Sequence, residues 1–326
     1  MKTRQSIKSI FLLIASALLL TAAGCGKAEG AGTVDDKLSL REQGIAYMGA
    51  GDYQNAELSF IKALSTSNGI VKQVDLDISY YLGVCEYKLG KPDEAIDTFS
   101  AIIGIDDGQE DAYYMRGKVE LAKGDKQRAF EDYDRALELE PSRYVLYQKI
   151  YMDLCDAGYE SEAGSYIGKA VSANEKMSDY QHGIFSYYLG NYDEARNYLE
   201  KARNEKKEDS RLIIYLGRCY NALGDSDYAA TLYQSWLDSN GDDAFIYNEL
   251  GLIRLGLSDP EGALSAFASG LETEDPDADQ CLRFNEIVAY ERAGEFARAR
   301  SRMEEYLKVY PSDKTAAREY EFLKTR

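Results

Sequence analysis

The chain has 326 residues, with 56 acidic and 38 basic side chains and a formal net charge of −18. An acidic surface of this kind repels phosphate backbones, which argues against nucleic-acid binding. The length exceeds that of one compact core, so it predicts either two domains or an elongated array of repeats. Only 5 prolines interrupt the hydrophobic pattern, whose period of about 3.6 residues predicts an all-helical protein.

The first 24 residues have the organisation of a secretion signal. Three basic residues precede an apolar run over 10–20, which is too short to span a bilayer. The sequence TAAGC at 21–25 resembles the lipobox of bacterial lipoproteins, in which the cysteine receives a diacylglyceryl group. The resemblance implies a signal peptide over 1–24, a lipid anchor on Cys25 and an extracytoplasmic location in a bacterial cell envelope. Secretion with cleavage elsewhere is the alternative.

A small, glycine-rich segment follows Cys25, and we expect residues 25–36 to form a flexible tether. The four other cysteines lie far apart in sequence, in four different helical units. Because a disulfide requires a specific geometry, we expect these four to be free core thiols. They are Cys85, Cys155, Cys219 and Cys281.

From Lys37 onward, the helical pattern repeats at intervals of 32 to 39 residues, and each of eight units carries an alanine in its second helix. These alanines are Ala56, Ala95, Ala129, Ala163, Ala195, Ala229, Ala263 and Ala299. Twelve residues earlier six units have a glycine: Gly44, Gly83, Gly117, Gly183, Gly217 and Gly251. Four residues after the alanine stands a large apolar residue: Phe60, Phe99, Tyr133, Ile167, Leu199, Tyr233, Phe267 and Met303. Since glycine inside a helix costs about 1 kcal/mol, its recurrence predicts close approach of the paired helices.

The segments LGVCEYKLGKPDEAIDTF and LGRCYNALGDSDYAATLY resemble the tetratricopeptide repeat, and the spacing of their landmarks holds across the eight units. The resemblance implies a right-handed α-solenoid of eight helix pairs over 37–311. Pro92 and Pro260 are predicted to start second helices, while Pro141, Pro276 and Pro311 are predicted to fall between units. We expect residues 312–326 to form a capping helix that begins after Asp313.

In tetratricopeptide repeats the first helix of each unit lines the concave face, so the resemblance assigns inward positions. The predicted peptide-binding groove residues are Tyr80, Tyr87, Tyr114, Lys118, Tyr180, Tyr187, Tyr188, Arg211, Arg218, Phe245 and Phe284. The aliphatic side chains assigned to the same face are Ile45, Ile184, Ile214, Leu252 and Val288. The other charged residues assigned to it are Arg41, Lys88, Arg292, Asp77, Asp111, Asp156 and Glu291. Packing of the aromatic residues between repeats is the alternative to ligand binding.

These features predict a membrane-tethered scaffold or adaptor that binds a protein or peptide segment in its groove and acts in envelope assembly. A solute- or glycan-binding lipoprotein that serves a transporter or a cell-wall enzyme is the alternative. We expect no enzymatic activity and no cofactor, because the one histidine, His182, has no nucleophile at a fixed spacing. The family's carboxylate clamp needs lysine and asparagine at set inward positions of adjacent units. It is not expected here, since Arg41 and Ile45 occupy the first pair of these positions and no later pair of units supplies the required residues.

One acidic stretch has the ligand spacing of an EF-hand calcium loop. Asp275, Asp277, Asp279 and Glu286 stand at offsets 1, 3, 5 and 12. The sixth position is Gln280 instead of glycine, and the segment from Leu282 onward is needed as helix. The alternative is an acidic linker whose carboxylates stabilise the N-terminus of the next helix.

Overall fold

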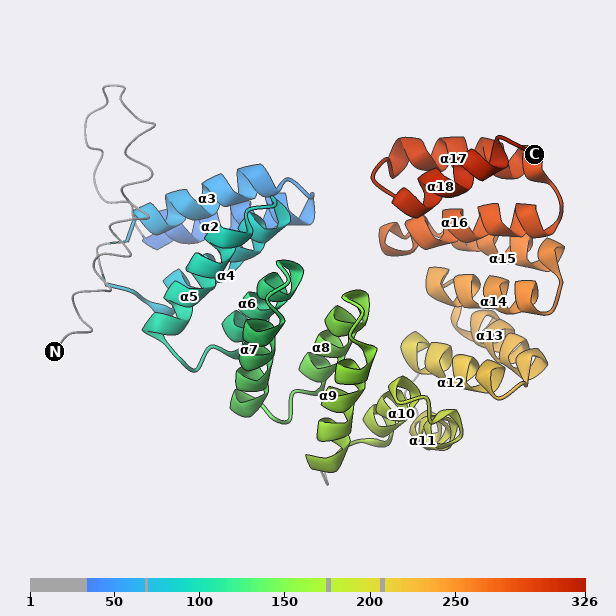
Figure 1. Ribbon diagram of the computed structural model, residues 1–326, viewed down its shortest axis with the longest axis horizontal. Helices are drawn as coiled ribbons and strands as arrows, with labels where there is room; N and C mark the ends of the chain where they lie inside the picture. The colour runs from blue at the N-terminus through green and yellow to red at the C-terminus, as the bar shows by residue number, and fades with distance from the viewer. Residues whose placement is uncertain (1–33, 68–69, 174–176, 206–208) are drawn as a thin grey trace. The chain divides into compact units, whose positions relative to one another are not determined.

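The computed structural model describes residues 34–67, 70–173, 177–205 and 209–326, and within these ranges it contains 17 helices and no strand (Figure 1). The first helices of the eight pairs are α2 (Val34–Gly49), α4 (Gln73–Lys88), α6 (Glu110–Ala122), α8 (Tyr144–Asp156), α10 (Asp179–Tyr188), α12 (Ser210–Ala222), α14 (Ala244–Gly256) and α16 (Pro276–Arg292). The second helices are α3 (Tyr53–Ser65), α5 (Pro92–Ile105), α7 (Lys126–Leu139), α9 (Glu160–Ala173), α11 (Tyr192–Asn204), α13 (Ser226–Asn240), α15 (Pro260–Glu272) and α17 (Phe296–Val309). A final helix, α18 (Lys314–Leu323), follows them. The predicted all-α solenoid of eight repeats is therefore confirmed.

The described part of the chain divides into two compact units, with the division between Tyr166 and Ile167. The recurring glycines explain how the helices of one pair approach each other. A Cβ atom built on any of the six would lie 2.3 to 3.0 Å from the large apolar residue sixteen positions later. The aromatic partners Phe60, Phe99, Tyr133, Tyr233 and Phe267 are fully buried. The close approach predicted from sequence is confirmed, because only a missing Cβ leaves room for these rings.

The N-terminal helix α2 begins at Val34, three residues before the expected start of helical structure at Lys37. The predicted signal peptide, the lipobox and Cys25 lie outside the described residues. No helix in the described part of the chain is long and apolar enough to cross a membrane.

The prediction that Pro276 falls between units is wrong, because this proline is the first residue of α16. Its missing N–H is harmless there, since the first amides of a helix have no intrahelical acceptor. The carboxylate of Asp275 caps the same helix by accepting a hydrogen bond of 2.9 Å from the N–H of Asp277. At the start of α18, Asp313 accepts hydrogen bonds from the N–H groups of Thr315 and Ala316, as the sequence predicts.

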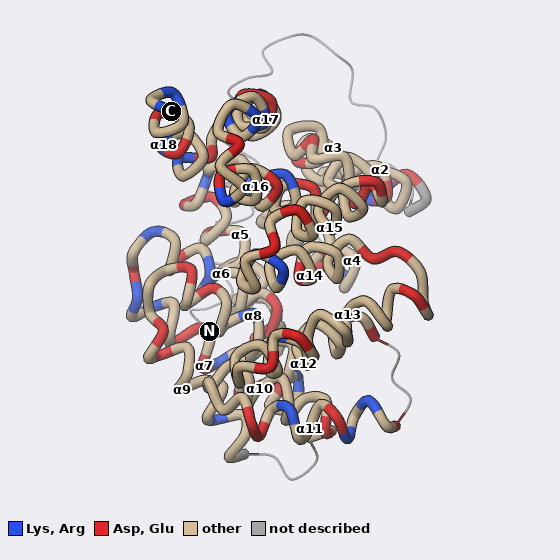
Figure 2. Tube along the Cα trace, turned by 90° about the vertical axis from the view of Figure 1, so that its right-hand side faces the viewer, with Lys and Arg blue, Asp and Glu red and all other residues tan. Residues whose placement is uncertain are grey.

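Acidic and basic residues are interspersed over the helices of each unit (Figure 2). Many of the basic side chains pair with a carboxylate of the neighbouring repeat. Lys91 on the turn before α5 contacts Glu57 of α3 at 2.7 Å, for example, and Lys118 of α6 contacts Asp153 of α8 at 2.5 Å. The net negative charge is therefore spread over many helices, and it is not concentrated on one of them.

Candidate interaction face on the first helices

The first helices of each unit pack side by side. In the N-terminal unit α2 contacts α4 and α4 contacts α6, and in the C-terminal unit α10, α12, α14 and α16 contact one another in order. Between successive second helices of the described chain no contact of similar extent occurs. We call the side of the first helices that faces away from the second helices the inner face of each unit.

A buried carboxylate on α8 binds two of the predicted groove residues. Asp153 accepts a hydrogen bond of 2.8 Å from the hydroxyl of Tyr114 and pairs with the ammonium of Lys118 at 2.5 Å, both from α6. Tyr114 is buried and its ring stacks on that of Tyr133, with 5.9 Å between the centroids. Burial and the nearby Asp153 raise the pKa of Tyr114 well above its usual range. Tyr114 and Lys118 therefore join neighbouring repeats.

Two arginines connect other first helices of the N-terminal unit in the same way. Arg41 of α2 donates a hydrogen bond of 2.5 Å to Asp77 of α4, and its guanidinium lies over the ring of Tyr81. Arg143, just before α8, donates to Asp111 of α6 at 2.8 Å. Each of these bonds occupies one oxygen of the carboxylate.

In the C-terminal unit, four tyrosines form a cluster on α10, α12 and the start of α11. The ring of Tyr187 lies 5.1 Å from that of Tyr215, 5.6 Å from that of Tyr192 and 6.0 Å from that of Tyr188. The hydroxyls of Tyr188 and Tyr215 are hydrogen-bonded at 2.6 Å. The structure thus brings together two predicted groove residues, Tyr187 and Tyr188. Tyr215 belongs to the same cluster and was not predicted from the sequence.

The two predicted groove arginines of α12 differ in their surroundings. Arg218 donates two hydrogen bonds, of 3.0 and 2.6 Å, to the carboxylate of Glu249 on α14, and this pairing raises its pKa further against the opposing effect of burial. Arg211 is 77% exposed, and among the described residues its ion-pair partner is Asp209, at 3.7 Å. Arg218 therefore links two repeats, whereas Arg211 is available to a ligand.

Large apolar side chains are exposed on the inner positions of two first helices. Val145 and Met152 on α8 are each 56% exposed, and Phe245 and Leu252 on α14 are 41% and 40% exposed. Within each pair the residues are seven positions apart, so they lie on the same side of their helix. Phe245 was predicted as a groove residue. Val145 and Met152 were missed, although their spacing is a signal that could have identified them.

The remaining predicted groove residues are half-buried. Tyr80 and Tyr87 lie on α4, Tyr180 on α10 and Phe284 on α16. The ring of Phe284 packs edge-on against Tyr306, with 5.8 Å between the centroids. The assignment of Ile184 and Ile214 to the exposed face is wrong, because both side chains are buried within the unit.

The residues with calcium-loop spacing lie on and just before α16, and so they do not form a loop. Asp279 pairs with Arg283 at 2.7 Å and accepts a hydrogen bond from Tyr310, while Glu286 is buried beside Arg302. Among the described residues, no group of three or more histidine, cysteine or carboxylate side chains could hold a metal ion. The helix is the physical reason, since it separates Asp279 from Glu286 by about two turns, or roughly 10 Å along its axis.

The cysteines and the histidine have structural surroundings. Cys85, Cys155, Cys219 and Cys281 are all free thiols, as predicted. Burial raises the pKa of Cys85 and of Cys219 to about 12, so neither is a reactive thiolate at neutral pH. The ring of His182 stacks on Tyr198, with 4.9 Å between the centroids.

Comparison with known proteins agrees with this architecture. Three models of the tetratricopeptide repeat match residues 41–110, 110–143 and 187–249. The chain belongs to the tetratricopeptide repeat family.

Several solved structures are similar to this chain. A tetratricopeptide repeat protein from Parabacteroides merdae ATCC 43184 is 18% identical, with 78% of this chain and 99% of that chain covered and a TM-score of 0.53. YrrB, described as a TPR protein with an unusual peptide-binding site, is 20% identical over 68% of this chain and 97% of its own, with a TM-score of 0.38. PilW, a type IV pilus biogenesis factor, is 18% identical over 61% and 92%, with a TM-score of 0.42. At these identities the likeness to the first structure shows the shared fold.

Proposed function

We propose that the chain is a non-catalytic scaffold or adaptor that binds a protein or peptide segment on the inner face of its first helices. The tetratricopeptide repeat is a fold used for protein interaction, and stacked repeats present an extended surface that suits an elongated partner.

The observation that carries this proposal is the exposure of two apolar pairs, Val145 with Met152 and Phe245 with Leu252. Each pair presents apolar side chains to solvent along one side of a first helix. Clustered exposed apolar side chains rimmed by polar residues mark interaction surfaces. The exposed Arg211 on α12 and Lys149 on α8 add charged groups in the same two units.

Site-specific photo-crosslinking in the native cells tests the proposal. A benzophenone amino acid is placed at Phe245, Leu252 or Met152, and for comparison at Leu58 of α3 or Val309 of α17, which are even more exposed apolar residues of second helices. We expect the same protein, identified by mass spectrometry, to be crosslinked from the inner positions and not from the two control positions. The purified partner should then bind the purified chain. Crosslinking from the control positions alone would refute binding on the inner face. Stabilisation of the chain by saccharides and not by the partner would favour the glycan-binding alternative.

We also propose that the protein is a lipoprotein, tethered through Cys25 to the extracytoplasmic side of a bacterial membrane, where it takes part in envelope assembly. The support comes from the basic residues, the apolar run and the TAAGC sequence of the N-terminus. One acyl chain gives only marginal membrane binding, while the two or more chains of a lipoprotein anchor it stably.

Labelling cells with an alkyne-bearing palmitate analogue tests the anchor. The wild-type chain and a Cys85→Ser variant should incorporate the label and remain with the membrane fraction, whereas Cys25→Ser should do neither. Equal labelling of the Cys25→Ser variant would refute lipidation at this cysteine.

A further inference from the structure

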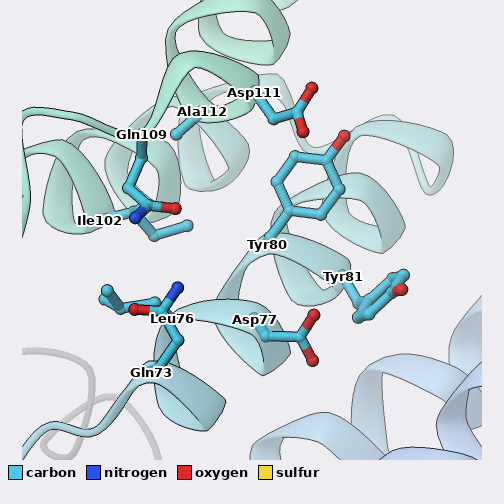
Figure 3. A pocket seen from close by; sticks show the side chains of 9 residues that line it. All are labelled: Gln73, Leu76, Asp77, Tyr80, Tyr81, Ile102, Gln109, Asp111 and Ala112. Atoms are coloured by element: carbon cyan, nitrogen blue, oxygen red, sulfur yellow. The ribbon is translucent and has the colours of Figure 1, made fainter.

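A pocket of about 220 Å³ opens between α4 and α6 in the N-terminal unit (Figure 3). Its apolar part is formed by Leu76 and Ile102, and its polar part by side chains that the proposed function has not used. Figure 3 shows the hydroxyl of Tyr80 beside the carboxylate of Asp111, and Asp77 also lines the pocket.

Each carboxylate that lines the pocket accepts a hydrogen bond from the described part of the chain at only one of its two oxygens. Arg41 binds Oδ2 of Asp77 at 2.5 Å, and Arg143 binds Oδ1 of Asp111 at 2.8 Å. Within the described chain no donor reaches the second oxygen of either carboxylate, and the hydroxyl of Tyr80 makes no hydrogen bond. Three of the residues that line the pocket therefore keep unused hydrogen-bonding capacity.

The charge around the pocket is negative. No lysine or arginine is among the residues that line it. The two arginines at its margin are each shared between two carboxylates, Arg41 between Asp77 and Glu42 and Arg143 between Asp111 and Glu110. Carboxylates thus outnumber the neighbouring cations, and an anionic group would be repelled.

We propose that this pocket receives the side chain of a lysine or arginine from the bound protein segment. A guanidinium or ammonium would donate to the free oxygens of Asp77 and Asp111 and lie against the ring of Tyr80, which gives both charge-assisted hydrogen bonds and a cation–π contact. The partner's segment is therefore basic where it crosses α4 and α6. This assignment rests on the proposed function, because it names the chemistry of the partner on the same inner face.

The size of the pocket favours a side chain over other occupants. Pockets for drug-sized ligands measure about 300–1,000 Å³, so this one is too small for a cofactor. The described residues also offer no set of three ligands for a metal ion. An arginine side chain, with its apolar stem against Leu76 and Ile102 and its planar head near the carboxylates of the lining, matches the residues present.

Nuclear magnetic resonance with small probes tests the pocket without the partner. N-acetyl-arginine amide and N-acetyl-lysine amide are titrated into the protein, with N-acetyl-glutamine amide as the neutral probe and calcium chloride as the alternative cation. We expect the two basic probes to shift the signals of Ile102, Leu76 and Tyr80. The double variant Asp77→Asn with Asp111→Asn should bind them about tenfold more weakly, since two partly exposed ion pairs contribute about 1–2 kcal/mol.

A matched variant, Asp193→Asn with Asp227→Asn on α11 and α13, removes the same charge from the surface of the other unit and should bind as the wild type does. Equal shifts with the glutamine probe, no shift with the basic probes, or displacement of the basic probes by calcium would overturn the proposal. None of these outcomes depends on the crosslinking at Phe245 and Met152, so failure of the pocket and failure of the scaffold function are distinguishable.

Discussion

The hydroxyl of Tyr114 donates a hydrogen bond of 2.8 Å to the carboxylate of Asp153, which joins α6 to α8 across 39 residues of sequence. The same carboxylate, only 9% exposed, pairs with Lys118. An aromatic hydroxyl and an ammonium that the sequence assigns to a binding groove are therefore held by the next repeat. The free energy of this contact stabilises the stacking of repeats and is not available for a ligand.

Replacement of Asp153 by alanine should destabilise the N-terminal unit. Tyr114 and Lys118 would lose their acceptor, and a buried hydrogen bond to a charged group contributes about 1.5–3 kcal/mol. We expect the free energy of unfolding to fall by about 2–3 kcal/mol in chemical denaturation. Asp156→Ala, at an exposed position of the same helix, is the control and should change it by less than about 0.5 kcal/mol. Equal effects of the two substitutions would contradict the role given to Asp153.

Gly217→Ala should destabilise the C-terminal unit by about 2–3 kcal/mol, because overpacking of a core has costs of this size. The added Cβ would lie 2.3 Å from the ring of Tyr233, which is fully buried and held by a hydrogen bond of 2.8 Å from its hydroxyl to the carbonyl of Ile214. Gly164→Ala on α9 meets nothing within 4 Å and should stabilise the protein by up to about 1 kcal/mol. Thermal denaturation of both variants checks the sign of each change.

Glu86 makes the free energy of unfolding of the N-terminal unit depend on pH. Burial raises the pKa of this carboxyl from 4.5 to about 7, although Thr98 donates a hydrogen bond of 2.7 Å to it. Because the folded state holds the proton more tightly than the unfolded state, the stability that Glu86 contributes is full below pH 4.5 and is lost as the pH rises to 7. Glu86→Gln should therefore match the wild type near pH 4.5 and exceed its stability at pH 8 by at most about 3 kcal/mol.

Denaturation of the Glu86→Gln variant and the wild type at pH 4.5, 6 and 8 measures this difference. The control is Glu138→Gln, whose side chain is 66% exposed, and its difference from the wild type should not change with pH. A difference in stability between Glu86→Gln and the wild type that is the same at all three pH values would refute the raised pKa of Glu86.

Phe245→Ser combined with Leu252→Ser should abolish capture of the partner while leaving the fold intact. Both side chains are about 40% exposed, so their loss removes little buried area and should change the free energy of unfolding by about 1 kcal/mol or less. Leu58→Ser with Val309→Ser removes a similar exposed apolar area from second helices and should leave capture unchanged. Calorimetric titration with the partner identified by crosslinking, alongside circular dichroism of each variant, separates loss of binding from loss of structure.

The sequence alone determined the helical class, the number of repeats and the contacts within each pair. Glycine, alanine and a large apolar residue recur at fixed spacing, and the spacing places them on one side of a helix whose partner follows within a few residues. The ring of Tyr233 against Gly217 is an example, since both residues belong to one helix pair and the steric requirement is local. A steric requirement between residues so close in sequence can be predicted from the sequence alone.

Only the tertiary structure decided which inward residues are free and which are used between repeats. Arg211 and Arg218 lie seven positions apart on one helix, yet the first is exposed and the second binds Glu249, 31 residues away. The pocket likewise needs Asp77 and Asp111 from different repeats, each with one oxygen already taken by an arginine of a further repeat. Helical periodicity fixes the side of a helix on which a residue lies. The reach of a long side chain to its partner depends on how the neighbouring repeat is packed, and that is a property of the folded chain.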